Sequence, residues 1–274
     1  MKIGIIGVGF VGGTHLKAFQ LANMDTAVFD IKYPESKIED VLDCDVTFVA
    51  LPSPTKDGQQ DLSILESTLT KLSELKYEGV LCIKSTVLPM TTYVIKRSFP
   101  NLKITHSPEF LKERTALSDF MIQTSVVVGG NECDTAKVVE AYQLQRQRCG
   151  LKALEAITPK DPSVSEMTKY MHNTFLALKV AYANQFAMAC KHINVDYDEV
   201  KQAAVSQGVI GESHLNVPGY DGKVGYSGTC FPKDVRALLS VFRNLTILRE
   251  ADNFNHFIRP HDENCKPIPI IEGQ

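Results

Sequence analysis

The sequence lacks an apolar run long enough to cross a membrane, and its first ten residues lack the form of a signal peptide. It also lacks a CxxC pair, and its seven cysteines are odd in number and irregularly spaced. That usage argues against a disulfide framework and against a zinc site, and it fits a reducing compartment. We therefore expect a cytoplasmic protein without a metal centre.

Strong charge of either sign is missing as well, because the formal net charge is only −3. A nearly neutral balance argues against nucleic acid or an acidic membrane as the main partner. Any anionic ligand must then be held by a local cluster of donors. The 274 residues are 44% hydrophobic and 22% charged, which is typical of a soluble globular enzyme with one large domain or two ordinary ones.

Short β-branched runs alternate with helical patterns through the first half of the chain. The runs that we expect to be strands are 2–7, 26–30, 45–52, 79–86, 103–108 and 124–130. Helical patterns lie between several of them, for example at 62–75 and 91–99. Buried strands that alternate with helices predict βαβ units, and so a doubly wound α/β domain with a mostly parallel sheet.

The second half reads as helical. Residues 161–193 form one long helical pattern, with Asp161 as its N-cap and Pro162 at its first position. Two or three shorter helical patterns follow, at 196–205, at 232–244 and, as the third, at 247–258. We expect three parts: an α/β domain over 1–160, a helical domain over 161–250 and a loose C-terminal tail over 251–274.

A glycine loop follows the first strand. Gly7, Gly9 and Gly12 have the GxGxxG spacing, in which the glycines allow a tight turn, close approach of a pyrophosphate, and helix–strand packing. The following helix N-terminus offers N–H groups to phosphates. Asp30 closes the second strand, where its carboxylate can accept from a ribose diol and repel a 2′-phosphate. NAD is therefore favoured over NADP, although Lys32 leaves NADP open.

Three polar groupings are candidates for chemistry. Lys169 and Asn173 lie four residues apart on the long helix, and hence on one face, unless they form only a solvated edge. Glu109 and Glu113 follow a strand, where paired carboxylates can move protons or position water; an exposed helical turn is the alternative. Thr86 ends another strand, at the edge where open α/β sheets bind ligands, or else it is a helix cap.

Cys230 lies in the stretch GYSGTCFPKD, just before a helix that Pro232 begins. A helix N-terminus favours the reactive thiolate form of cysteine. Lys233 and Asp234 fall in the first turn, close enough to belong to one site. The alternative is a small residue that fills a core, which is the usual fate of a free cysteine.

Five motifs, in order along residues 1–250, resemble those of the UDP-glucose/GDP-mannose dehydrogenase family. They are GIIGVGFVG, STVLPMTT, SPEFLKE, KYMHNTFLALKVAYANQ and GTCFPKD. The resemblance implies a Rossmann-like NAD-binding domain followed by an all-helical central domain, through which two subunits commonly pair.

The resemblance also implies a reaction and the residues that perform it. The reaction is a four-electron oxidation of the C6 alcohol of a nucleotide sugar, UDP-glucose first among candidates, to the uronate, with two NAD+ and Cys230 as nucleophile. The implied catalytic residues are Thr86, Glu113, Lys169, Asn173, Cys230 and Asp234. The implied cofactor-binding residues are Gly7, Gly9, Phe10, Val11, Gly12, Asp30, Lys32, Thr86 and Glu113. The implied substrate-binding residues are Glu109, Phe110, Leu111, Lys169, Asn173, Tyr226 and Gly228.

The chain departs from the family in three respects. The family normally continues into a third α/β domain, which we expect this chain to lack. Ser125 and His214 stand near places where the family has arginines, so we expect a weaker grip on a diphosphate. Two other hypotheses stay open at this point: an NAD-binding assembly module with impaired catalysis, and a two-electron β-hydroxyacid dehydrogenase. The latter needs no nucleophilic cysteine.

Overall fold

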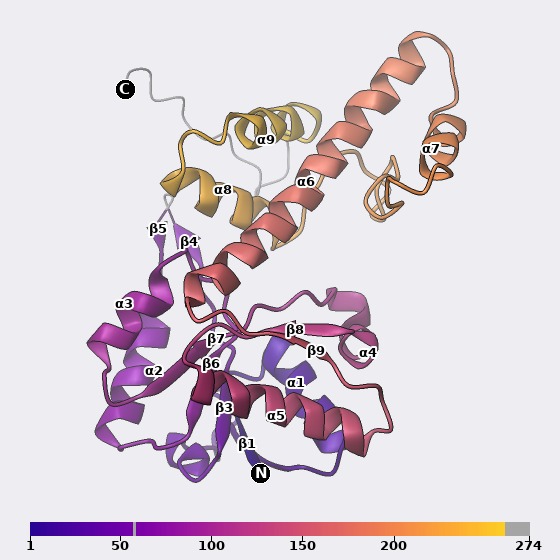
Figure 1. The fold of residues 1–274 in the computed structure, drawn as a ribbon. Helices are drawn as coiled ribbons and strands as arrows, with labels where there is room; N and C mark the ends of the chain where they lie inside the picture. Colours follow the sequence, from indigo (N-terminus) through magenta and orange to yellow (C-terminus); the bar gives the residue numbers. More distant parts are fainter. Residues whose placement is uncertain (57–58, 261–274) are drawn as a thin grey trace. The chain divides into compact units, whose positions relative to one another are not determined.

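A computed structural model describes residues 1–56 and 59–260 (Figure 1). Contacts divide the chain into two compact units. The first holds Met1–Lys56 and Gln60–Lys169, and the main part of the second begins at Tyr170.

The first unit is built on a five-stranded parallel sheet with the order β2-β1-β3-β6-β7. Its strands are β1 (Lys2–Ile6), β2 (Asp25–Phe29), β3 (Val46–Val49), β6 (Val80–Ile83) and β7 (Lys103–His106). The chain adds β2 on one side of β1 and β3 on the other, so the direction of strand addition reverses at β1. Ligands of such sheets bind at this reversal, and the glycine loop follows β1 directly. The predicted doubly wound parallel sheet is thus confirmed as Rossmann-like.

The sixth predicted strand does not join this sheet. Residues Ser125–Val127 form β8, which pairs in parallel with β9 (Glu155–Ile157), and only a single bridge between His106 and Gly129 reaches β7. A separate short pair is formed by β4 (Thr55–Lys56) and β5 (Gln59–Gln60).

Helices cover both faces of the sheet because alternate strand residues point to opposite sides. The helices of this unit are α1 (Phe10–Leu21), α2 (Ser63–Glu74), α3 (Thr91–Ser98), α4 (Ala116–Ile122) and α5 (Glu132–Arg148), with short 3₁₀ turns η1 (Ile38–Val41) and η2 (Glu113–Thr115). One face packs on α1, α4 and α5, and the other on η1, α2 and α3.

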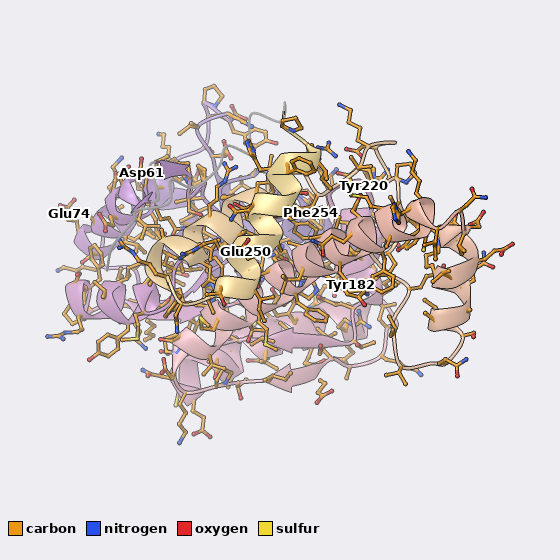
Figure 2. All side chains as sticks on the ribbon, turned by 90° about the horizontal axis from the view of Figure 1, so that it is seen from above. Asp61, Glu74, Tyr182, Tyr220, Glu250 and Phe254 are labelled. Atoms are coloured by element: carbon orange, nitrogen blue, oxygen red, sulfur yellow. The ribbon has the colours of Figure 1, made fainter. Side chains whose placement is uncertain are left out.

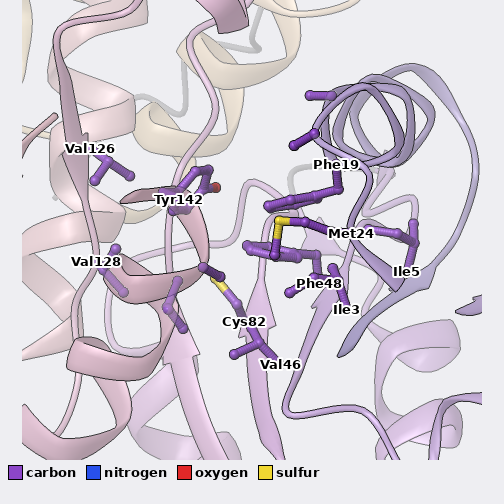
Figure 3. Packing of buried hydrophobic residues seen from close by; sticks show 14 of the residues in the cluster. Ile3, Ile5, Phe19, Met24, Val46, Phe48, Cys82, Val126, Val128 and Tyr142 are labelled. Carbon is purple, nitrogen blue, oxygen red and sulfur yellow. The ribbon is translucent and has the colours of Figure 1, made fainter. Parts of the chain in front are cut away.

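Aromatic rings fill the first of these two cores. Figure 3 shows Phe19, Phe48 and Tyr142 converging from α1, β3 and α5. The rings of Phe19 and Phe48 stack at 5.3 Å, and Tyr142 meets Phe48 edge-on at 5.4 Å. His15 lies among the same rings, 5.0 Å from that of Phe120. The core on this face therefore contains a fully buried imidazole.

Helices α6 (Pro162–His192), α7 (Tyr197–Val205), α8 (Phe231–Val241) and α9 (Thr246–Ile258) follow. The start of α6 is as predicted: Pro162 is its first residue, and the Asp161 carboxylate accepts from Ser163 N at 2.8 Å. Asp196 caps α7 in the same way. Helix α9 runs past residue 250, where the sequence placed the start of a tail; the rest of that tail, from 261 on, lies outside the described residues.

Candidate active site

The glycine loop has the shape that the GxGxxG spacing predicts. Gly7 has φ +85°, and a Cβ on Gly12 would lie 1.9 Å from the Gly7 carbonyl oxygen, so helix α1 could not pack with any side chain there. Gly9, in contrast, is exposed, and a Cβ there would meet no atom within 4 Å. The loop is thus tight on the protein side and open on the outer side, where α1 begins. This form fits a dinucleotide pyrophosphate.

Asp30 lies at the end of β2, beside this loop. Its Oδ2 accepts a short hydrogen bond from Val8 N, and its Oδ1 accepts from Lys32 N at 2.7 Å. A carboxylate has about four acceptor positions, so Asp30 retains lone pairs for a ribose diol. Lys32 is exposed, and Phe10 and Val11 form the first turn of α1.

A buried ion pair that sequence reasoning missed lies beneath the carboxyl ends of β6 and β7. Lys84 Nζ is 3.4 Å from Glu109 Oε2 and donates to Ser107 Oγ at 3.0 Å and to Tyr142 Oη at 3.2 Å. Both charged residues are buried. Burial by itself would raise the pKa of Glu109 and is the largest single effect. Lys84, His15, the hydrogen bond from Phe110 N and Lys169 together outweigh it, so the pKa lies below the usual value. A lysine that ends the apolar run VLCI was the available signal.

His15 extends this network to the glycine-loop helix. Its Nδ1 is 3.0 Å from Val11 O, and its Nε2 is 3.0 Å from Tyr142 Oη and 3.5 Å from Glu109 Oε2. Burial, with the nearby Lys84 ammonium, lowers the pKa of His15 to about 4, so the ring is neutral at neutral pH. The neutral ring donates from Nδ1 to Val11 and accepts at Nε2 from Tyr142. We call this group of four residues the buried network: Lys84, Tyr142, His15 and Glu109.

The segment after β7 carries four of the predicted site residues. Glu109, expected beside cofactor and sugar, turns its carboxylate into the buried network. Its carbonyl oxygen accepts a short hydrogen bond from Lys169 Nζ, which also lies 5.3 Å from the centre of the Phe110 ring. Leu111 is half-buried and packs against the core, whereas Glu113 is exposed at the start of η2. The structure thus brings Lys169 to Glu109 and Phe110.

Thr86 lies in the loop that joins β6 to α3. Its carbonyl oxygen accepts from Ser53 Oγ at 2.8 Å and from Gln60 Nε2 at 2.7 Å. The far end of this loop is held by Glu166 of α6, a fully buried residue that sequence reasoning also missed. Its carboxylate accepts from Met90 N and Thr92 N, each at 2.7 Å, and so supplies the cap that α3 lacks from its own side chains.

In the second unit, Asn173 and Asp234 meet. Asn173 Nδ2 donates to Asp234 Oδ2 at 2.6 Å, and Lys233 Nζ lies 2.6 Å from Asp234 Oδ1. Asn173 and Asp234 are both buried. The carboxylate is therefore held between an amide and an ammonium, an arrangement that can orient water and exchange protons.

Cys230 is exposed at the N-cap position of α8, where its backbone oxygen accepts from Asp234 N at 2.9 Å. Cys230 and Asp234 are thus one helical turn apart. Gly228 precedes them with φ +84°, which favours glycine. Tyr226, a predicted substrate contact, is buried, and its hydroxyl donates to Asp252 Oδ1 at 2.7 Å.

The predicted residues therefore fall into two groups, one in each unit. Thr86, Glu109 and Lys169 belong to the first group and Asn173, Cys230 and Asp234 to the second, while α6 carries both Lys169 and Asn173. Among the described residues, no group of three or more metal-ligating side chains could hold a metal ion. No described helix is both long and apolar enough to span a membrane.

Comparison with known proteins identifies the family to which this arrangement belongs. Residues 33–145 match the NAD binding domain of the UDP-glucose/GDP-mannose dehydrogenase family, and residues 163–256 match the central domain of the same family. The chain belongs to this family. The NAD binding domain that it carries establishes NAD as the cofactor of the first unit, in agreement with the glycine loop and Asp30.

Several relatives are named for UDP-glucose oxidation. A UDP-glucose 6-dehydrogenase of Haloferax volcanii is 31% identical over 89% of this chain and 66% of its own length. One from Rickettsia typhi is 29% identical, over 89% of this chain and 56% of its own. The solved UDP-glucose dehydrogenase of Pyrobaculum islandicum is 25% identical with a TM-score of 0.81, over 93% of this chain and 68% of that one. The chain thus spans about half to two thirds of the length of the curated relatives that it matches.

Proposed function

We propose that this chain catalyses the NAD-dependent, four-electron oxidation of a nucleotide sugar at C6, with UDP-glucose as substrate and UDP-glucuronate as product. The observation that carries the proposal is the position of Cys230: an exposed thiol at the start of α8, one turn from an Asp234 that is bonded to Asn173. The substrate is proposed from the names of the relatives.

NAD+, when bound at the glycine loop, accepts a hydride in each of two successive oxidations. The first oxidation of the C6 alcohol leaves an aldehyde. The Cys230 thiolate adds to its carbonyl carbon, and the oxygen takes a proton to give a thiohemiacetal. Loss of the second hydride and of the hydroxyl proton gives a thioester. Water then adds to the thioester carbon and the thiolate leaves, which yields the carboxylate and regenerates Cys230.

The other residues serve these steps through charge and hydrogen bonding. Lys169 and Asn173, one turn apart on α6, would donate to the oxyanions that develop at C6. Asp234 would take protons and orient the hydrolytic water, and Glu113 and Thr86 would assist in water positioning. Phe110, Leu111 and Gly228 would contact the sugar nucleotide. Because the side chains of Glu109 and Tyr226 are buried, their contribution would come from their backbone and from the segments that they hold.

Two alternatives predict different stoichiometries. An assembly module with impaired catalysis would bind NAD+ without producing NADH. A two-electron β-hydroxyacid dehydrogenase would produce one NADH per substrate, and its turnover would not depend on Cys230. The exposed cysteine at a helix N-terminus favours the four-electron reaction, since neither alternative uses it.

The deciding experiment counts NADH per UDP-glucose consumed, for the wild-type chain and for Cys230→Ser. We expect two NADH per sugar, and loss of turnover in the variant because a serine hydroxyl is not ionised near neutral pH. Cys133→Ser, which removes an exposed thiol on α5, is the matched control and should keep two NADH per sugar. NAD+ binding without NADH from UDP-glucose would sink the proposal for this chain and favour the module.

We also propose that α6 pairs two copies of the chain. Its residues Met171, Phe175, Tyr182 and Phe186 are exposed, and their spacing places them on one helical face (Figure 2 labels Tyr182). Light scattering should give twice the mass of one chain. Phe175→Glu combined with Tyr182→Glu should halve that mass, because charge would be buried without a partner. The control Ile247→Glu, at an exposed apolar position on α9, should not. A wild-type monomer would contradict the pairing.

A cytoplasmic location stays a prediction from cysteine usage.

A further inference from the structure

The loop that leads to Cys230 is attached to α9 by side chains that lie outside every motif of the sequence analysis. Asp252, Asn255 and Arg259, on α9 or directly after it, each bond to the segment Asp221–Tyr226. From this arrangement we infer that α9 acts as a positioning element for Cys230, with Asn255 at its centre. The inference rests on the proposed function in one respect, that Cys230 is the nucleophile.

Asn255 binds both backbone polar groups of a single residue. Its Oδ1 accepts from Tyr226 N at 2.7 Å, and its Nδ2 donates to Tyr226 O at 3.0 Å. Asn255 is fully buried, and Tyr226 is nearly so. A carboxylate could accept but not donate here, and an apolar side chain could do neither. The carboxamide thus fixes the backbone at residue 226 in the way that a paired strand would.

The Tyr226 side chain provides the second attachment. Its hydroxyl donates to Asp252 Oδ1 at 2.7 Å, and both residues are buried. Burial raises the pKa of Asp252, and the hydrogen bond from Tyr226 opposes that shift. The tyrosine ring also meets the ring of Phe231, the first residue of α8, edge-on at 6.3 Å.

Position 225, directly before Tyr226, has no room for a side chain and is a glycine. It has φ +75°, and a Cβ there would lie 2.5 Å from Asn255 Oδ1 and 3.3 Å from a methyl carbon of Ile258. Its N–H donates to Asn184 Oδ1 of α6 at 3.1 Å. On the far side, Arg259 Nη1 donates to Val224 O at 3.1 Å. Backbone and α9 therefore approach each other as closely as glycine permits.

The position of Cys230 follows from these attachments. Residues 227–229 join the fixed Tyr226 to Cys230, at which α8 begins. Such a short connection, anchored at both ends, leaves the cysteine backbone little freedom to move. Helix α9 is thus a positioning element that acts on Cys230 through Tyr226.

The experiment attaches a nitroxide to Cys230 in a chain in which Cys133, Cys149 and Cys265 are replaced by serine, and records its mobility by electron spin resonance. In Asn255→Leu, which keeps the side-chain size but removes both hydrogen bonds, we expect the label to move about tenfold faster than in the parent. The same variant with the label on Cys133, in a chain in which Cys149, Cys230 and Cys265 are replaced by serine, is the control and should show unchanged mobility. Asp252→Asn keeps an acceptor for the tyrosine hydroxyl and should retain the parent spectrum.

Unlabelled protein provides the second measurement. Asn255→Leu should lower kcat for NADH formation about tenfold with the KM for NAD+ unchanged, whereas Asp252→Asn should keep both. If Asn255→Leu does not fold, Tyr226→Phe removes one bond and should still raise label mobility. Unchanged mobility at Cys230 in a folded Asn255→Leu or Tyr226→Phe variant would overturn the inference. A mobile label in a wild-type chain that makes no NADH would count against both proposals, whereas an immobile label in such a chain would count only against the enzyme.

Discussion

Replacing Lys84 by methionine is expected to lower the free energy of unfolding of the first unit by about 3–5 kcal/mol. The substitution keeps the length of the side chain but leaves the Glu109 carboxylate buried without the ammonium that lies 3.4 Å away. Tyr142 loses a donor in the same step. Urea unfolding followed by circular dichroism measures the change, because the sequence contains no tryptophan.

Two controls separate charge from packing. Lys103→Met removes an exposed strand lysine and should change stability by less than about 0.5 kcal/mol. Lys84→Met combined with Glu109→Gln removes both charges, and it should recover most of the loss because no uncompensated charge remains. If the double variant is as unstable as Lys84→Met, the ion pair is not the cause. The loss should also affect activity, since Glu109 holds Lys169 through its carbonyl oxygen.

Between pH 6.5 and pH 4.5 the free energy of unfolding of the first unit is expected to fall with falling pH. The expected slope is about 1.4 kcal/mol per pH unit for each of two buried histidines, His15 and His106. Burial, and then Lys84, lowers the pKa of His15 to about 4 and that of His106 to about 3. Below the ordinary histidine value of 6.5, the unfolded chain therefore binds protons that the folded chain does not. Stability is complete above pH 6.5 and falls as the pH falls toward the folded values.

Glu166 makes this slope of the unfolding free energy with pH less steep. The pKa of Glu166 is raised by burial, so the folded unit takes that proton first and part of the loss is offset. Urea midpoints at pH 7, 6 and 5 measure the slope. His15→Leu should reduce it by about half, because one of the two proton acceptors is gone. His192→Gln, at an exposed position on α6, is the control and should leave it unchanged. An unaltered slope in His15→Leu would show that another group carries the acid sensitivity.

Features that depend on neighbours in sequence could be read without the structure. The spacing of Gly7, Gly9 and Gly12 predicts a loop whose backbone contacts lie within a few residues, such as that between Gly12 and Gly7. Helix α6 was predicted within one residue at each end, since Asp161 and Pro162 act locally. Pro232 likewise predicts a helix start beside Cys230, although α8 begins one residue earlier than expected, at Phe231.

Strand lengths and partners were read less well. The run 45–52 contributes only Val46–Val49 to the sheet, and its later residues belong to the loop that follows β3. The run 124–130 has the composition of a sheet strand, yet β8 pairs with β9. Composition reports that a segment is extended and buried, but not which strand it will pair with.

The sequence by itself determined the nature of the protein: a dinucleotide loop, a long helix with Lys169 and Asn173, and a cysteine at a helix start. These depend on local backbone preferences and on side-chain spacing along one element. Only the tertiary structure decided that Lys84 and His15 are buried with Glu109, that Glu166 caps α3, and that Asn255 holds Tyr226. Each of these contacts joins residues at least 25 positions apart. A buried polar group is tolerated only where its partner arrives from elsewhere in the fold, and no local pattern records that arrival.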